Sequence, residues 1–183
     1  MADSVPSRSG IVAFDGHDGT GKTTLARAVA DELNASYQRP FGGDTGLLLL
    51  RAHQAGDQAA VLRIGSAALL AASRHAGDDR PIVLDRSWLT VGSLLSDEDF
   101  SEHWTLWIPT ILCWADLSMT LRRLGERDEP TESVASHQHF IERYRALAQR
   151  RSCPIVDTSQ ATVAESTAQA LDEARLLLSL SGY

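Results

Sequence analysis

Residues 16–23 of this chain read GHDGTGKT, and this octapeptide decides the fold that we expect for the whole protein. It matches the pattern G-x-x-x-x-G-K-[ST], in which glycines let the backbone curl until successive N–H groups point at phosphate oxygens. The apolar run Ile11–Phe14 comes before it, and a helical pattern begins near Lys22. A strand therefore leads into the loop and the positive end of a helix dipole follows it, as a phosphate-binding loop requires.

The loop motif gives each of its polar side chains an expected contact. Lys22 is the only lysine among the 17 Lys and Arg residues, and its compact ammonium suits the β- and γ-phosphates of ATP better than a planar guanidinium would. Thr23 supplies a hydroxyl for Mg²⁺, and Thr24 supplies one for the α-phosphate. The expected nucleotide-binding residues are Gly16, Asp18, Gly19, Thr20, Gly21, Lys22, Thr23 and Thr24. The loop alone does not choose among kinases, hydrolases and motors.

Length and composition limit the classes of protein that this chain can be. With 183 residues, 43% of them hydrophobic and 22% charged, it is expected to form one globular domain over residues 10–183, after a polar, disordered leader at 1–9. A net charge of −7 argues against a nucleic-acid binder, and no apolar run approaches the ~20 residues needed to cross a membrane. The leader lacks the apolar centre of a signal peptide, so a cytoplasmic location is expected, with Cys113 and Cys153 as reduced thiols.

Short β-like runs alternate with longer helical patterns along the chain, which predicts a parallel sheet wrapped by helices. Strands are expected at residues 11–14, 35–39, 81–85, 110–114 and 154–157. Helices are expected at 22–34, at 44–75 with a break near Gly56, at 117–124, at 131–151 and from 162 onward, whereas 87–107 show no clear period. The predicted fold class is α/β: a single domain with a five-stranded parallel sheet in the order 2-3-1-4-5 and helices on both faces. Its ligand crevice is expected beyond the carboxyl ends of the strands.

Asp85 and Arg86 end the third predicted strand, so we expect them to project into that crevice. The carboxylate of Asp85 can order a Mg²⁺ shell or take a proton from an acceptor, and the guanidinium of Arg86 can hold an anion through two hydrogen bonds. The alternatives are a helix N-cap for Asp85 and a surface ion pair for Arg86. Asp15 and Asp18 are further acids beside the loop, and they suit a polyphosphate only with a divalent cation between.

Three arginines, Arg122, Arg123 and Arg127, precede an acidic segment that ends at Pro130. One interpretation is a short lid at about residues 122–132, which brings guanidinium charge onto a transferring phosphoryl group and excludes water. The other is a set of cations that complement the negative C-terminal end of a helix dipole. The residues alone leave both interpretations open.

In this order, the motifs resemble those of the thymidylate kinase family of nucleoside monophosphate kinases. The similar segments are FDGHDGTGKTT at 14–24, RPFGGDT at 39–45, ASR at 72–74, DR at 85–86 and LRRLGER at 121–127. They are spread over most of the chain, which makes the resemblance more specific than any single motif. It implies the fold of that family, its kinase activity and a homodimer.

The resemblance also implies roles for individual residues. The catalytic set that it implies is Lys22, Asp85, Arg86, Arg123 and Arg127, and the metal-placing set is Thr23, Asp18 and Asp85. The implied substrate-binding set is Arg39, Phe41, Leu70, Arg74, Arg86 and Trp88. In this scheme ATP and Mg²⁺ lie on the phosphate loop, and the arginines of the substrate-binding set grip an acceptor phosphate. Arg123 and Arg127 are the lid positions.

The expected acceptor pocket departs from the family's pattern. The family has an aromatic platform for thymine four residues before the position of Arg74, where this chain has Leu70. Residues 87–95 read SWLTVGSLL and lack the family's polar base-reading groups. Because a base read by hydrogen bonds is discriminated strongly, their loss points to a changed acceptor. The run Asp85-Arg86-Ser87 is also similar to the acid-Arg-Ser motif of deoxynucleoside kinases, whose acceptor is a sugar hydroxyl.

Three functions therefore stay open. The first is an ATP- and Mg²⁺-dependent kinase of a nucleoside monophosphate or nucleotide-like acceptor. The second is a kinase of a nucleoside or other small metabolite with a hydroxyl acceptor, and the third is a nucleotide-binding regulatory module without catalysis. None of them requires a nucleic-acid polymer or a membrane as partner. His17, His137 and His139 receive no functional role, because His137 and His139 are two apart and do not share a helix face.

Overall fold

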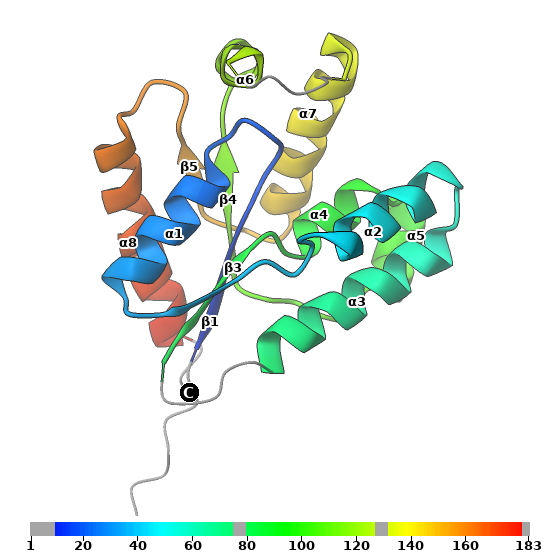
Figure 1. Ribbon diagram of the computed structural model, residues 1–183, viewed down its shortest axis with the longest axis horizontal. Coiled ribbons are helices and arrows are strands. Elements are labelled where there is room, and N and C mark those ends of the chain that lie inside the picture. The colour runs from blue at the N-terminus through cyan, green and yellow to red at the C-terminus, as the bar shows by residue number, and fades with distance from the viewer. Residues whose placement is uncertain (1–9, 75–79, 127–131, 181–183) are drawn as a thin grey trace, which may run out of the picture.

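The computed structural model of this protein describes residues 10–74, 80–126 and 132–180. A five-stranded sheet runs through its centre (Figure 1). The strands are β1 (Ile11–Asp15), β2 (Ser36–Gln38), β3 (Ile82–Asp85), β4 (Thr110–Trp114) and β5 (Ile155–Asp157). Neighbouring strands pair in parallel in the order β2-β3-β1-β4-β5, so the predicted sheet and its order are confirmed.

The strand order places the loop after β1 at the point where the chain changes sides of the sheet. After β1 the chain forms β2 and β3 on one side, and it then crosses to form β4 and β5 on the other. Connections that leave in opposite directions open a crevice at the carboxyl ends of the central strands. The octapeptide at 16–23 follows β1 directly and therefore lies at this crevice.

Helices fill the connections and cover both faces of the sheet (Figure 1). They are α1 (Lys22–Glu32), α2 (Asp44–Gln54), α3 (Gln58–Arg74), α4 (Trp88–Ser93), α5 (Asp97–His103), α6 (Leu117–Gly125), α7 (Val134–Arg150) and α8 (Val163–Leu180). α1 and α8 pack together over one face, whereas α3, α4 and α7 lie on the other. The predicted break is confirmed at Gly56, whose φ of 70° is an angle that glycine adopts without strain.

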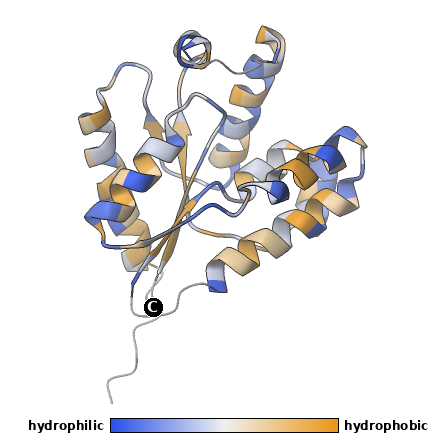
Figure 2. Cartoon of the chain, viewed as in Figure 1, coloured by the Kyte–Doolittle hydropathy of each residue, from blue (hydrophilic) through white to orange (hydrophobic). Residues whose placement is uncertain are grey.

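The strands divide their side chains between two hydrophobic cores, because successive residues of a strand point to opposite faces. Val12 and Phe14 are buried with Val29 of α1 on one face. Ala13 and Leu84 are buried on the face that α3, α4 and α7 cover. Apolar residues fill the strands and the inner sides of the helices, while polar ones gather on the outer helix surfaces (Figure 2). Coverage of both faces explains why the strands read as continuous apolar runs.

Cys113 is buried in β4, Cys153 is partly buried before β5, and both are free thiols. Burial raises the pKa of Cys153 to about 11, so this thiol stays protonated at neutral pH. Within the described ranges, no helix combines the length and the apolar character that crossing a membrane needs. The leader expected at residues 1–9 lies outside the described residues.

Candidate functional site

The phosphate loop, residues 16–23, joins β1 to α1 at the carboxyl edge of the sheet. Gly16 has a φ of 153°, and a Cβ there would meet the Cys113 carbonyl oxygen at 2.2 Å, so only glycine fits. The Thr20 hydroxyl donates to the His17 carbonyl oxygen at 2.7 Å and holds the turn. Gly21 is the N-cap of α1, and no described side chain caps this helix end. The first N–H groups of α1 are therefore available to an anion.

Lys22 is buried at the base of the loop, with 6% of its surface exposed. Its Nζ lies 3.0 Å from Asp18 Oδ1, and Arg86 Nη2 lies 2.5 Å from the same oxygen. Although burial favours the neutral acid, the charges of Lys22 and Arg86 hold the pKa of Asp18 well below its usual range. Burial and the charge of Arg86 lower the pKa of Lys22. Asp18, expected to help place a metal, thus pairs with two cations, and a bound phosphate would compete with it for both.

Asp85 closes the carboxyl end of β3 and is 3% exposed. Its Oδ2 accepts hydrogen bonds from the hydroxyls of Thr23 at 2.8 Å and Tyr37 at 2.7 Å, and Arg39 Nε lies 3.6 Å away. Its Oδ1 is buried and has no hydrogen-bond partner among the described residues. A buried, unpaired carboxylate oxygen is costly, and a donor or a cation that reached this atom would remove the cost. The N-cap of α4 is Ser87, so Asp85 does not have the alternative role of helix cap.

Arg86 bends the chain sharply after β3. Its φ of 84° is a left-handed backbone angle, which costs a residue other than glycine about 1–3 kcal/mol. Its N–H donates to the Phe14 carbonyl oxygen at 2.8 Å and holds the bend. The guanidinium lies 3.3 Å from the Thr90 hydroxyl and 3.5 Å from the Tyr144 hydroxyl, in addition to its pair with Asp18. The bend thus directs Arg86 back toward the loop. Its side chain is 25% exposed and pairs with Asp18, whose side chain is 54% exposed, so Arg86 forms the ion pair of the alternative interpretation while it lines the crevice.

Asp15 is fully buried at the end of β1. Its carboxylate accepts hydrogen bonds from the N–H groups of Gly16, Ser87 and Thr90, each at 2.8 Å, and from the Thr90 hydroxyl at 2.7 Å. Burial raises its pKa, while the charge of Arg86 and these donors oppose the rise. Asp15 therefore ties β1 to the start of α4. The expectation that this acid needs a divalent cation is wrong, because donors of the chain itself satisfy it.

Three cavities surround the phosphate loop. The loop cavity, about 250 Å³, is lined by Asp18, Gly19, Gly21, Lys22, Thr23, Thr24, Arg39, Phe41, Gly42, Asp85 and Arg86. The wide cavity, about 470 Å³, is lined by residues of α2, α4 and α7 and shares Asp18, Phe41 and Arg86 with the loop cavity. The side cavity, about 360 Å³, lies between the loop, Arg123 and the connection from β5 to α8. The structure thus brings most of the expected site residues together around one cavity.

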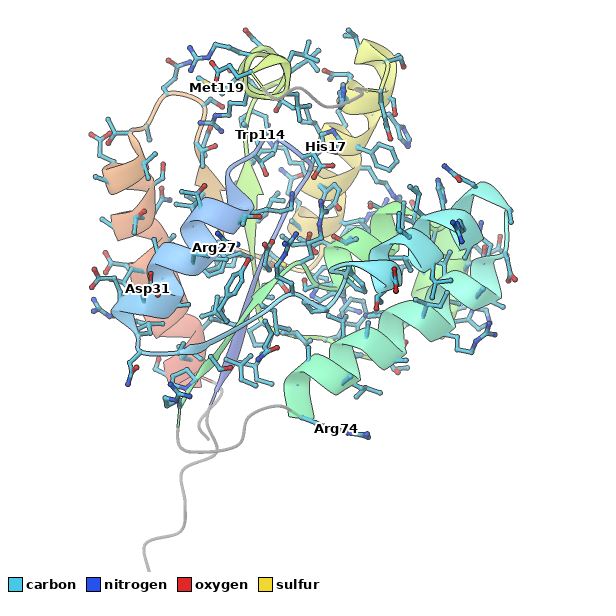
Figure 3. The ribbon with its side chains drawn as sticks, in the orientation of Figure 1. His17, Arg27, Asp31, Arg74, Trp114 and Met119 are labelled. Carbon is cyan, nitrogen blue, oxygen red and sulfur yellow. The ribbon has the colours of Figure 1, made fainter. Side chains whose placement is uncertain are left out.

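Leu70, Arg74 and Trp88 are the expected substrate-binding residues that line neither the loop cavity nor the wide cavity. Arg74 ends α3, which leads toward the start of β3, so it lies at the opposite edge of the sheet from the loop (Figure 3). Leu70 lies one turn earlier and is 41% exposed. Trp88 is 2% exposed, and its indole N–H donates to the Ile108 carbonyl oxygen at 3.0 Å. The expected placement of Leu70 and Arg74 is corrected, because a helix that returns the chain to the start of a parallel strand must end at the amino edge. That of Trp88 is corrected because its ring is buried in the hydrophobic core.

Arg123 lies at the side cavity rather than over the loop cavity. Its guanidinium donates to the Gly19 carbonyl oxygen at 3.0 Å and to the hydroxyl and carbonyl oxygens of Thr158 at 2.9 and 2.8 Å. Arg123 thus joins the loop to the β5–α8 connection. It does not lie over the loop cavity, where a lid arginine was expected. Arg122 is on α6, with Nη2 3.1 Å from Met119 Sδ. Arg127 and most of the expected lid after residue 126 lie outside the described residues.

A wall of ring side chains along the wide cavity was missed by sequence reasoning. His17 is 9% exposed, its Nε2 lies 2.8 Å from His137 Nδ1, and its ring stacks on Phe140 with centroids 5.7 Å apart. Burial lowers the pKa of His17 to about 4, and burial raises that of the neighbouring Tyr144 to about 12. His137, Phe140 and Tyr144 recur at spacings of three and four on α7, and this was the signal that they share one helix face.

A phosphate loop between the central strand and the first helix, at the switch point of a parallel sheet, is the architecture of P-loop nucleotide-binding proteins. Among solved structures, the chain is similar to thymidylate kinase from Candida albicans, with a TM-score of 0.67, 20% identity, and 93% of this chain and 94% of that chain covered. It is also similar to deoxyadenosine kinase from M. mycoides with dCMP and dCDP bound, with a TM-score of 0.64, 13% identity, and 91% and 99% covered. No protein-family model and no curated protein matches the sequence. The chain has the thymidylate kinase-like fold that its motifs led us to expect.

Proposed function

We propose that this protein is an ATP- and Mg²⁺-dependent kinase that phosphorylates a small acceptor bound in the wide cavity. The observation that carries the proposal is the loop cavity, where the phosphate loop, buried Lys22 and the unpaired Oδ1 of Asp85 meet beside a second, larger cavity. Phosphoryl transfer depends on positioning and on charge stabilisation more than on covalent chemistry of the enzyme. The folds of a thymidylate kinase and a deoxyadenosine kinase support the same class.

ATP would occupy the side cavity and the loop cavity together. Its phosphates would lie on the N–H groups of the loop and on Lys22. Its base would lie in the side cavity, where the planar guanidinium of Arg123 is held by Gly19 and Thr158 and offers a stacking face. Thr24 lines both cavities, so its hydroxyl would contact an α-phosphate that connects them.

The residues at the loop cavity fit Mg²⁺. The Thr23 hydroxyl and the Asp85 carboxylate are hard oxygen ligands, and Mg²⁺ is commonly held by one or two carboxylates together with the phosphates of a substrate. When bound, the ion would neutralise charge on the β- and γ-phosphate oxygens. Asp18 would instead hold Lys22 and Arg86 together until the phosphates of ATP replace its carboxylate.

A hydroxyl group is the acceptor that the wide cavity favours. Among the described residues that line it, Arg86 is the only Lys or Arg, and its guanidinium is already paired with Asp18. Glu132 lines the same cavity and adds a negative charge. An acceptor phosphate would bring roughly two further negative charges, whereas a neutral hydroxyl compound brings none. The Oδ1 of Asp85 would accept the hydroxyl proton as the oxygen attacks the γ-phosphate.

A nucleoside monophosphate is the second candidate acceptor, and Arg39 is the observation in its favour. Arg39 lines the loop cavity with 57% of its side chain exposed, and it would exchange its 3.6 Å pair with Asp85 for an acceptor phosphate. A phosphate between Arg39 and Arg86 would meet two guanidinium groups. This arrangement lacks the third arginine that the family resemblance implies, because Arg74 lies at the opposite edge of the sheet.

The test is ADP release from ATP and Mg²⁺ with matched pairs of nucleosides and their 5′-monophosphates. We expect turnover of the phosphate-free member of a pair and at least tenfold weaker turnover of its monophosphate. Lys22→Ala should lower kcat by about 100-fold or more while the melting temperature stays that of the wild type, because a preorganised charge at the transferring phosphates is lost. Lys22→Arg is the control that keeps the charge and changes only its shape.

Each of the other results points elsewhere. Faster turnover of the monophosphate than of its nucleoside would favour the second candidate. ATP binding without ADP release for any acceptor would support the regulatory module. Wild-type turnover by Lys22→Ala would contradict the assignment of the loop as the donor site.

A further inference from the structure

The wide cavity contains a histidine whose hydrogen bonding fixes its tautomer. His53, near the end of α2, has its Nδ1 2.8 Å from the carbonyl oxygen of Leu94, which follows α4. A carbonyl oxygen can only accept a hydrogen bond, so Nδ1 carries the proton. The neutral ring then has an unprotonated Nε2, which is an acceptor and meets no donor among the described residues. In the neutral imidazole, Nε2 of His53 can therefore only accept a hydrogen bond.

Three further polar side chains that line the cavity also present acceptors, whereas the amide of Gln54, next to His53, can donate as well as accept. The Ser93 hydroxyl donates its proton to the Thr90 carbonyl oxygen at 2.8 Å, so only its lone pairs remain for a ligand. The Ser136 hydroxyl likewise donates to the carboxylate of Glu132, which has no proton of its own to offer. Ser93, Ser136 and Glu132 all line the wide cavity with His53. A ligand group that faces His53, Ser93, Ser136 and Glu132 must bring hydrogen-bond donors, because a carbonyl oxygen there would face acceptors.

The cavity is long enough for a compound that reaches from the loop to His53. Gly46 and Gln54 of α2 both line it, and at 1.5 Å of rise per residue they are about 12 Å apart along the helix axis. At one end the cavity shares Arg86 with the loop cavity, where the acceptor hydroxyl is assigned, whereas His53 lines the wide cavity alone. Leu49 and Phe140 supply apolar surface for a flat ring.

We propose that His53 selects the acceptor of this kinase by accepting a hydrogen bond at Nε2 from an exocyclic amino group. The acceptor is thus an amino-bearing heterocycle joined to a hydroxyl-bearing group, of about the length of a nucleoside. The hydroxyl end of this assignment rests on the proposed function, but recognition of the amino group is measurable by binding alone. Compounds with a carbonyl in place of the amino group are rejected, because acceptor would meet acceptor.

Binding is measured by titration calorimetry with pairs that differ only in the amino group, in the presence of Mg²⁺ and a non-hydrolysable ATP analogue. The pairs are adenosine against purine riboside and cytidine against 2-pyrimidinone riboside. We expect the amino-bearing member of at least one pair to bind roughly tenfold more tightly. Equal affinities within both pairs, or no binding of either pair, would overturn the proposal.

Two variants separate recognition by His53 from its structural bond to Leu94. In His53→Asn the amide nitrogen replaces Nδ1 as donor to Leu94, but nothing replaces Nε2. This variant should keep the wild-type melting temperature and lose the preference for the amino group. In His53→Gln the amide oxygen can take the place of Nε2, so the preference should persist even though the bond to Leu94 is lost. A preference that survives in His53→Asn would overturn the proposal.

The outcomes also distinguish this inference from the proposed function. A preference for the amino group without ADP release would support recognition by His53 and contradict the proposed kinase activity. ADP release with equal turnover of both members of each pair would support the kinase activity and contradict the recognition by His53.

Discussion

Tyr37 lies on β2, which contains none of the sequence motifs, and its hydroxyl donates a hydrogen bond to the carboxylate of Asp85. Its hydroxyl and that of Thr23 both donate to Oδ2, and this leaves Oδ1 as the oxygen that a ligand can use. Burial and the hydrogen bond to Asp85 raise the pKa of Tyr37, so the phenol keeps the proton that it donates. At the scale of single residues, the two oxygens of Asp85 thus have different tasks.

Tyr37→Phe removes this donor and keeps the ring, which lies with its centroid 5.5 Å from the guanidinium carbon of Arg27. Hydrogen bonds to charged groups contribute about 1.5–3 kcal/mol, so we expect kcat to fall about tenfold or more. The measurement is steady-state kinetics with the best acceptor. Arg27→Ala is the comparison, since it removes the cation that lies over the ring and beside the hydroxyl of Tyr37 but leaves that hydroxyl as a donor to Asp85. A kcat within about twofold of the wild type in Tyr37→Phe would show that Asp85 is held without Tyr37.

α4 is the element whose position the wide cavity depends on. It carries Thr90 and Ser93, it is tied to β1 through Asp15, and it packs on α3 at Gly65. A Cβ at Gly65 would meet Val91 Cγ2 at 2.6 Å, so the two helices touch where only a hydrogen fits. The short helix is therefore placed by contacts with two other elements rather than by its own length.

Gly65→Ala tests this contact. Alanine favours a helix interior over glycine by about 1 kcal/mol, but overpacking a buried contact costs about 1–3 kcal/mol. Because Val91 is fully buried and branched, we expect the clash to win and the free energy of unfolding to fall by about 1 kcal/mol. Urea denaturation of the variant and the wild type measures this change in the free energy of unfolding. The double variant with Val91→Ala should lose less stability than the sum of the two single variants, and strict additivity would contradict the contact.

The whole molecule holds the phosphate loop from both flanks. On one side Arg123 joins Gly19 to Thr158 near the start of α8, and on the other His17 joins the loop to His137 of α7. A movement of α7 or of the start of α8 would therefore displace the phosphate loop. The homodimer implied by the family resemblance stays a prediction, and light scattering of the protein in solution tests it.

The pair of histidines predicts how stability depends on pH. The pKa of His17 is about 4 in the folded protein, because of burial, against 6.5 in an unfolded chain. Above pH 6.5 neither state binds the proton. Between these two values the unfolded state binds it and the folded state does not, so stability falls as the pH falls. From pH 7 to pH 5 this loss is about 2 kcal/mol.

Urea denaturation at pH 7, 6 and 5 measures the contribution of His17. In His17→Gln the amide can still meet His137 but does not titrate, so the loss between pH 7 and pH 5 should shrink by about 2 kcal/mol. His139→Gln is the matched control, because His139 is exposed on α7 and this variant keeps His17, so the part of the loss that His17 causes should persist. If the free energy of unfolding of His17→Gln falls between pH 7 and pH 5 as much as that of the wild type, the pKa of His17 is not lowered in the folded protein.

Local patterns of the chain were enough to predict the loop, the strands and the α/β class. The octapeptide at 16–23, the short apolar runs and the helical periods are properties of neighbouring residues, and secondary structure responds to neighbours. Matching the short segment ASR to the family failed at Arg74, because three residues do not show where along its helix a side chain lies. Asp85, Arg86 and Arg39 could be expected at the site because each lies at or just beyond the carboxyl end of a strand.

The contacts that make the site specific were decided by the tertiary structure. Tyr37 reaches Asp85 across 48 positions of the chain, and His17 reaches His137 across 120. The proton of His53 is assigned only because α2 packs beside the end of α4 and meets the Leu94 carbonyl oxygen. Hydrogen bonds form only within about 3 Å and in narrow directions. Such pairs therefore exist only after packing has brought distant segments together, whereas the phosphate loop is formed by adjacent residues whose backbone angles the glycines allow.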